Sequence, residues 1–217
     1  MATAAEHDPT EAPSDRYRAR LLDALLPLVP ELGWTETAMR RAAEAAGLSL
    51  GEVQLAAPGG VGDMLDELGA RAAREAGRRM SRPDVAGMKI REKVTAGVLA
   101  YLAALAPYKA ALKRASGSPF NLLAGPKAMW SAADRIWAGL GDTSNDFNWY
   151  TKRMTLSAVL GSTLLCWLGT DDDAEVETFL THRIENVMQF EKTKKQVQDA
   201  FEKMPNPLDF LGRKPGG

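Results

Sequence analysis

Apolar residues recur along this chain at the spacing of amphipathic helices, and no segment alternates apolar and polar residues as a strand would. The first such run covers residues 17–32 and ends at Gly33, which is a typical helix-terminating residue. Thr35 then offers an N-cap to a second helix, which Gly47 terminates. A third short helix follows over residues 48–57, so the beginning of the chain predicts three short helices in a helix-turn-helix arrangement.

Longer helices are predicted beyond this part. Gly169 predicts the end of one of them, and three aspartates, Asp171 to Asp173, supply N-capping oxygens for the last. The predicted fold class is therefore all-α, a helical bundle whose longer helices cover about 62–80, 85–105, 107–115, 126–140, 150–168 and 173–204.

The segment 141–153 gathers two acids, two amides, three aromatic residues and two cations immediately before an apolar helix. One interpretation is that Phe147, Trp149 and Tyr150 close the end of the core. The other is a contact surface, because Trp, Tyr and Arg are enriched at interaction hot spots and Arg153 follows one turn later. The residues alone leave both interpretations open.

The helix that follows, 154–168, is apolar on nearly every side. It falls short of the 18 or more residues expected of a membrane span. Such a helix is either a central core helix or the wall of an apolar cavity. The tryptophans and methionines of this half of the chain are equally compatible with a core or with a pocket between helices. We predict an apolar pocket lined by Met129, Trp130, Met154, Leu160, Leu164 and Trp167.

Composition favours an ordinary globular protein and no polyanionic partner. Of 217 residues 45% are hydrophobic and 25% charged, and the net charge is −1. No signal peptide or transmembrane span is expected, and the first 15 residues contain no arginine of the kind a mitochondrial import sequence needs. The apolar residues Val197, Phe201 and Met204 lie among lysines, a pattern that fits either an interfacial helix or a packed one.

No set of residues predicts catalysis, a metal site or a cofactor. His7 and His182 are the only histidines, too few for a histidine-based metal cluster or triad, and no Gly-rich phosphate loop with its lysine is present. DNA binding is also disfavoured. The third helix has no cation, and residues 14–57 contain five Arg/Lys against six Asp/Glu.

The run from Gly141 through Trp167, with its Asp-Phe-Asn-Trp-Tyr core, resembles the Coq-nine family of ubiquinone-biosynthesis accessory proteins, as do residues 181–188. The start of the chain, 25–48, is similar to the same family and shares its pattern with TetR-type regulators. The resemblance covers roughly residues 17–198. It implies a TetR-like fold, usually dimeric, that holds an isoprenoid lipid or ubiquinone precursor and no longer reads DNA.

The resemblance also implies a partner, the di-iron hydroxylase of ubiquinone biosynthesis, and a partner-binding surface at Asp134, Ile136, Trp149, Tyr150 and Arg153. It implies a non-enzymatic protein. Since the first residues do not resemble a mitochondrial import sequence, we expect a bacterial member that works in the cytoplasm, with peripheral contact to the inner membrane. The competing function is a TetR-type transcriptional regulator that senses an apolar ligand. The expected organisation begins with a disordered tail over 1–15 and a helix-turn-helix-like part over 16–60. A lipid-binding and dimerisation domain is expected over 61–204, and an irregular tail over 205–217.

Overall fold

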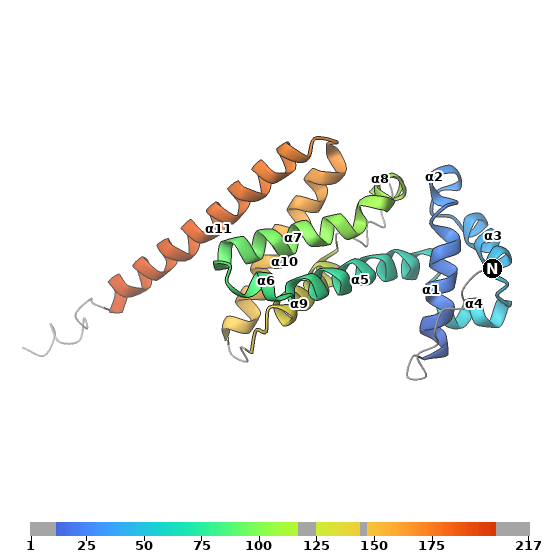
Figure 1. Ribbon diagram of the computed structural model, residues 1–217, viewed down its shortest axis with the longest axis horizontal. Helices are drawn as coiled ribbons and strands as arrows, with labels where there is room; N and C mark the ends of the chain where they lie inside the picture. Colours follow the sequence, from blue (N-terminus) through green and yellow to red (C-terminus); the bar gives the residue numbers. More distant parts are fainter. Residues whose placement is uncertain (1–11, 117–124, 144–146, 203–217) are drawn as a thin grey trace, which may run out of the picture.

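The computed structural model is an all-α protein with the helices α1 to α4 at one end and a larger helical bundle forming the rest (Figure 1). It describes residues 12–116, 125–143 and 147–202, except the side chains of 147 and 190–202. No strand occurs in these ranges, and the predicted fold class is confirmed. The two expected tails fall largely outside the described residues, although residues 13–15 already belong to the first helix.

The N-terminal helices are locally specified by their caps. The Thr35 hydroxyl accepts a hydrogen bond from the Ala38 amide at 3.1 Å, and Gly47 adopts a left-handed conformation at φ 60°, which glycine reaches without strain. Ser49 and Glu52 form a reciprocal capping box at the start of the next helix. These helices are α1 (Pro13–Leu25), α2 (Val29–Leu32), α3 (Glu36–Ala46) and α4 (Leu50–Ala56).

The long helix α5 (Val61–Met80) connects this end to the larger bundle (Figure 1). Its successors begin and end within a few residues of the predicted positions. They are α6 (Pro83–Ala86), α7 (Ile90–Leu105), the 3₁₀ turn η1 (Ala106–Tyr108), α8 (Lys109–Ser116), α9 (Pro126–Gly139), α10 (Phe147–Gly169) and α11 (Asp173–Glu202).

Close approach of α5 and α9 holds the centre of the bundle together. A Cβ atom on Gly139 would overlap the Gly77 carbonyl group, and one on Gly77 would lie 2.9 Å from the Arg135 carbonyl oxygen. The two helices therefore cross at a distance that only glycine at both positions allows. This crossing fixes the position of α9, which carries Trp130, Asp134 and Trp137.

Helix α10 is buried on one side only, although its sequence is apolar on nearly every side. Leu160 and Leu164 are fully buried, whereas Met154 is 63% exposed and Leu165 is 53% exposed. It is therefore a wall of the bundle and not a helix enclosed on all sides. An apolar strip on its outer side is left uncovered.

One continuous helical run, Ile90–Ala115, is long and apolar enough to cross a membrane by length and composition. It has 26 residues and a mean hydropathy of 1.3, and 33% of its most apolar window is buried. No such span was expected from the sequence. A helix packed in the core of a soluble protein meets the same criterion, and α7 contributes fully buried residues such as Val98 and Leu105 to the core.

Candidate functional site

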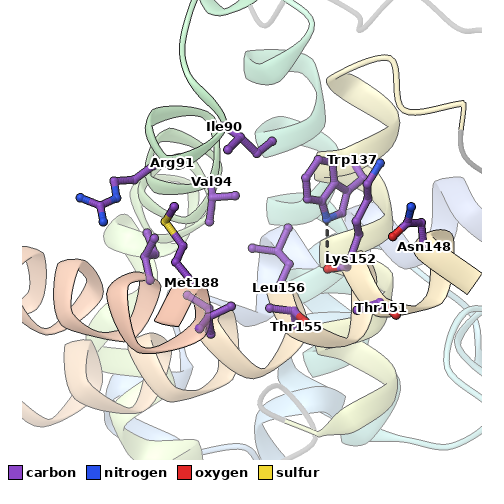
Figure 2. A pocket seen from close by; sticks show the side chains of 13 residues that line it. Ile90, Arg91, Val94, Trp137, Asn148, Thr151, Lys152, Thr155, Leu156 and Met188 are labelled. Carbon is purple, nitrogen blue, oxygen red and sulfur yellow. Dashed lines mark hydrogen bonds between the residues drawn. The ribbon is translucent and has the colours of Figure 1, made fainter. Parts of the chain in front are cut away.

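An apolar pocket lies where the start of α7, the end of α9, the first half of α10 and α11 meet (Figure 2). Its volume is about 330 Å³, within the range of small-molecule sites. Val94, Leu156 and Met188 point toward this space from three different helices (Figure 2). The full lining is Ile90, Arg91, Val94, Trp137, Asn148, Thr151, Lys152, Thr155, Leu156, Val159, Ile184, Val187 and Met188.

The charged side chains around the apolar pocket are engaged with other groups at its edge. Arg91 lies 3.6 Å from the carboxylate of Glu185, and both side chains are about half exposed. Lys152 pairs with Asp142 at 2.7 Å, and the backbone carbonyl of Lys152 accepts a hydrogen bond from the Trp137 indole (Figure 2). The interior of the pocket is consequently apolar, suited to a hydrocarbon chain.

The rim of the apolar pocket exposes large apolar side chains to solvent. Ile90 is 54% exposed and Met188 is 45% exposed, on opposite helices. An apolar side chain of this size at a pocket entrance extends the apolar surface outward. A chain longer than the pocket could therefore continue across this rim.

The lipid-binding residues predicted from the sequence lie elsewhere. Met129, Trp130 and Met154 line a second, more open hollow on the other side of α10, of about 350 Å³, with Ala158 and Gly161. The remaining three predicted residues, Leu160, Leu164 and Trp167, are buried among core residues. The structure thus brings half of the predicted set together and places the other half in the core.

Three aromatic residues from α9 and α10 form an aromatic patch, defined here as Trp130, Trp149 and Tyr150. The rings of Trp130 and Trp149 meet edge to face with centroids 5.6 Å apart, and those of Trp149 and Tyr150 at 4.8 Å. Tyr150 is 62% exposed, and both tryptophans are partly exposed. For Trp149 and Tyr150, these exposed fractions fit the interpretation as a contact surface better than the interpretation as part of the core.

Arg153 lies beneath the aromatic patch and is almost completely buried. Its side chain is 3% exposed and bonds to Asp134 at 2.6 Å and to Asp142 at 3.1 Å. The guanidinium stacks over the Trp149 ring at 4.1 Å, a cation–π contact. Arg153 therefore orients Trp149 and secures the α9–α10 connection, while its charge is not presented at the surface.

The other two predicted partner-binding residues also differ in position. Asp134 has a side chain 43% exposed, at the edge of the aromatic patch. Ile136 is fully buried, and a Cβ on Gly97 of α7 would lie 2.7 Å from its Cγ2 atom. Ile136 therefore packs α9 against α7 and does not reach the surface where a partner would bind.

Sequence reasoning missed the apolar pocket because its walls come from four separate helices. Ile90 and Val94 precede Ile184 and Val187 by about ninety residues in the chain. Each pair has the spacing of one helix face, which was visible in the sequence. Nothing in the sequence indicated that these faces meet at one end of the bundle and leave a space.

Among the described residues, no three His, Cys, Asp or Glu side chains are grouped so that they could bind a metal ion.

Comparison with known proteins identifies relatives of this chain. Residues 123–191 match the COQ9 family model. The chain is 27% identical over 205 residues to "Ubiquinone biosynthesis protein COQ9, mitochondrial" of Homo sapiens, covering 89% of this chain and 64% of the human protein. It is 28% identical over 209 residues to the Drosophila melanogaster protein of the same name, covering 91% of this chain and 63% of that protein. The match therefore spans just under two thirds of the length of these relatives.

A solved structure shares the fold. A TetR-family transcriptional regulator from Streptomyces coelicolor superposes with a TM-score of 0.52 at 19% identity, covering 91% of this chain and 94% of that one. At this identity the likeness concerns the fold alone. The chain therefore carries a COQ9 family domain at residues 123–191, is a homologue of the curated COQ9 proteins, and has a TetR-like all-α fold.

Proposed function

We propose that this protein is a non-enzymatic accessory protein of ubiquinone biosynthesis that binds an isoprenoid lipid or ubiquinone precursor. The observation that carries the proposal is the apolar pocket between α7, α9, α10 and α11, in a chain homologous to the COQ9 proteins. The surface of the pocket is mostly apolar, and the charges at its edge are paired. This combination favours a hydrocarbon ligand over a charged one.

The size of the apolar pocket limits what it encloses. At about 30 Å³ for each heavy atom, by analogy with the volume of a water molecule, 330 Å³ holds about eleven heavy atoms. That corresponds to about two isoprene units. A longer isoprenoid would leave across the rim at Ile90 and Met188.

The aromatic patch is the proposed docking surface for the di-iron hydroxylase. Trp149 and Tyr150 supply partly exposed aromatic area on the first turn of α10, and Met154, 63% exposed, extends it by a further turn. Arg153 and Ile136 contribute by positioning the two helices from below. Asp134 completes the predicted surface at its edge.

Assembly and location are further parts of the proposal. The uncovered outer side of the second half of α10, at Leu165, is suited to pairing two copies into a homodimer. The relatives' printed names place them in mitochondria. For this chain we propose a bacterial cytoplasmic location with peripheral contact to the inner membrane. The tail residues thought to make that contact, 197–204, have no described side chains.

Two substitutions on α10 distinguish the lipid sites. Thr155→Trp fills the apolar pocket, whereas Ala158→Trp fills the second hollow with Met129, Trp130 and Met154. We expect lipid extracted from purified protein, measured by mass spectrometry, to be lost with Thr155→Trp and kept with Ala158→Trp. The reverse result would move the ligand to the hollow. Wild-type protein without any isoprenoid would end the lipid-binding proposal.

The docking surface is tested by Trp149→Ala. Removing an aromatic anchor typically costs about 2 kcal/mol of binding, which corresponds to roughly thirtyfold in affinity. We expect that loss in hydroxylase co-purification, with helicity and lipid content close to wild type. Leu50→Ala, on an exposed residue at the opposite end of the molecule, serves as the control. If the hydroxylase co-purified equally with wild type and Trp149→Ala, Trp149 would not contribute to the docking surface.

The competing function is a TetR-type regulator, which the solved structural neighbour makes worth testing. Helix α4 occupies the recognition position, but it exposes Leu50 by 90% and Leu55 by 61%. A base-reading helix needs polar or cationic side chains there. A salt-resistant shift of DNA upstream of the gene would favour the regulator.

A further inference from the structure

Cations gather where α5 ends, α6 turns and α7 begins. Residues 74–93, which cover this part of the chain, contain seven Arg/Lys against three Asp/Glu, in a chain whose net charge is −1. The excess is local, so the overall composition does not reveal it. Helices α5 and α7 are neighbours, and α6 joins them at one end of the bundle (Figure 1). We call this region the basic corner, defined by Arg78, Arg79, Arg82, Lys89, Arg91 and Lys93.

The three acids of residues 74–93 are already engaged. Two of them, Glu75 and Asp84, are paired with arginines of α5, each at 2.8 Å. The third, Glu92, accepts a hydrogen bond at 2.7 Å from a backbone amide at the start of α7. These acids therefore compensate only part of the positive charge of the basic corner.

Three cations of the basic corner form no ion pair with any residue that the structure describes. They are Arg82, Lys89 and Lys93. Arg82 and Lys89 are exposed, and Arg82 acts on Asp84 only at longer range. The charge of these three side chains is therefore available to an anionic partner, and the attraction weakens as salt is added.

An exposed apolar side chain lies among these charges. Ile90 follows Lys89, precedes Arg91 and is 54% exposed. Ala86 and Gly87, in the turn before it, are exposed as well. Long basic side chains around a projecting apolar residue are typical of a surface that lies in the interface of a bilayer. A nucleic acid would match the charge but offers no apolar layer to Ile90.

Two hollows open beside the basic corner. Ile90 lies at the rim of the apolar pocket, and Arg91 lines it. On another face of α7, Arg79 and Arg82 belong to one wall of a shallow groove of about 550 Å³. The other wall of this groove is apolar and comes from α7 residues between Ala96 and Ala104. Cations beside apolar hollows suit amphiphilic molecules, which carry both kinds of group.

The second half of α11 extends from the bundle at this same end. Arg91 lies 3.6 Å from the Glu185 carboxylate, which places the start of α7 against the middle of α11. The helix then continues to Glu202, beyond the bundle (Figure 1). The tail residues proposed above for membrane contact begin in this last part of α11, so both features lie at one end of the molecule.

We propose that the basic corner docks the protein on the surface of an anionic phospholipid bilayer. Arg82, Lys89 and Lys93 contact the phosphate groups, and Ile90 enters the layer at the level of the headgroups. The rim of the apolar pocket then faces the bilayer, so that a lipid can pass into the pocket without crossing water. This inference rests on the proposed lipid binding for the purpose of docking, and it assigns membrane contact to a surface of the folded bundle.

The test removes the three unpaired charges of the full-length protein in one triple variant, Arg82→Gln, Lys89→Gln and Lys93→Gln. Sedimentation measures binding to vesicles of phosphatidylcholine with phosphatidylglycerol and to vesicles of phosphatidylcholine alone. Each basic residue near an anionic surface raises binding by about fivefold, so the triple variant should bind anionic vesicles roughly a hundredfold more weakly than wild type. Wild-type binding should fall with added salt and be weaker on the neutral vesicles.

The matched control removes three exposed cations elsewhere, Arg40→Gln, Arg41→Gln and Lys127→Gln, and changes the net charge equally. It should bind anionic vesicles nearly as wild type does. Equal loss in the two variants would show that net charge alone acts and would overturn the inference. Equal binding of wild type and the triple variant would place the membrane contact in the tail and also overturn it. Wild-type binding that is the same on both kinds of vesicle would do so as well.

Mass spectrometry of lipid extracted from the same wild-type sample separates this inference from the proposed function. Protein that carried isoprenoid but bound no anionic vesicles would overturn the docking and leave the proposed function intact. Protein that docked through the basic corner but carried no isoprenoid would support the docking and end the lipid-binding proposal. Binding of duplex DNA that the triple variant loses, without binding of vesicles, would assign the basic corner to nucleic acid and overturn the inference.

Discussion

Arg153 offers the most exacting prediction, because it connects the stability of the bundle to the geometry of the aromatic patch. Its guanidinium contacts Asp134 at 2.6 Å, Asp142 at 3.1 Å and the Trp149 ring at 4.1 Å. The substitution to examine is Arg153→Met, which keeps the volume of the side chain and removes all three contacts. It leaves Asp142, whose side chain is 7% exposed, with less compensation for its charge.

The expected cost follows from that burial. Removing one partner of a buried ion pair costs about 3–5 kcal/mol, because the other charge is left behind. Here Lys152 still contacts Asp142 at 2.7 Å, which lowers the expected cost to about 2–4 kcal/mol. For a chain of this length each kcal/mol shifts the melting temperature by about 2–4 °C, so a fall of about 4–16 °C is expected.

Differential scanning calorimetry measures this fall, and Lys152→Met is the comparison. Lys152 contacts the same carboxylate, but its side chain is 34% exposed, and such pairs contribute about 1 kcal/mol or less. Arg153→Lys should lie between the two, because an ammonium cannot reach both carboxylates as a guanidinium does. If Arg153→Met melted no lower than Lys152→Met, the buried network would not be what holds α9 to α10.

Two further predictions concern packing and pH. Gly139→Ala should lower the free energy of unfolding, measured with a chemical denaturant, by about 1–3 kcal/mol, because its Cβ would overlap the Gly77 carbonyl group. Gly51→Ala, in open space within α4, should be neutral or stabilising. Similar effects of the two substitutions would refute the close crossing of α5 and α9. Hydrogen bonds from Lys113 and then Lys109 hold the pKa of the Asp171 carboxyl below its usual range. A carboxyl whose pKa is lowered in the folded state stabilises the protein above about pH 4, and this stabilisation is lost as the pH falls through the pKa of the folded state. The difference in melting temperature between wild type and Asp171→Asn should therefore disappear in acid. A difference that stayed constant down to pH 2 would show that the carboxylate charge is not involved.

The sequence by itself determined the local elements of this protein. The caps Thr35 and Gly47 and the end of α10 at Gly169 were predicted and observed. The amide of Ala174 bonds to Asp172 at 2.9 Å, as expected of an aspartate at the start of α11. These features depend on a few neighbouring residues and on the helical period, so they can be read without knowing the fold. The aromatic residues Phe147, Trp149 and Tyr150 also stand out in the sequence, although the structure places them in the first turn of α10 and not before the helix.

Only the tertiary structure decided what each helix face meets. Arg153 and Trp149 share a helix turn, yet one is buried between two carboxylates and the other reaches the surface. Ile136 faces Gly97 of α7, and the apolar pocket forms from helices far apart in the chain. Period and composition give the direction of a side chain around its own helix. Whether that direction ends in a partner, in solvent or in a cavity depends on the crossing of α5 and α9 and on the long-range packing that follows from it.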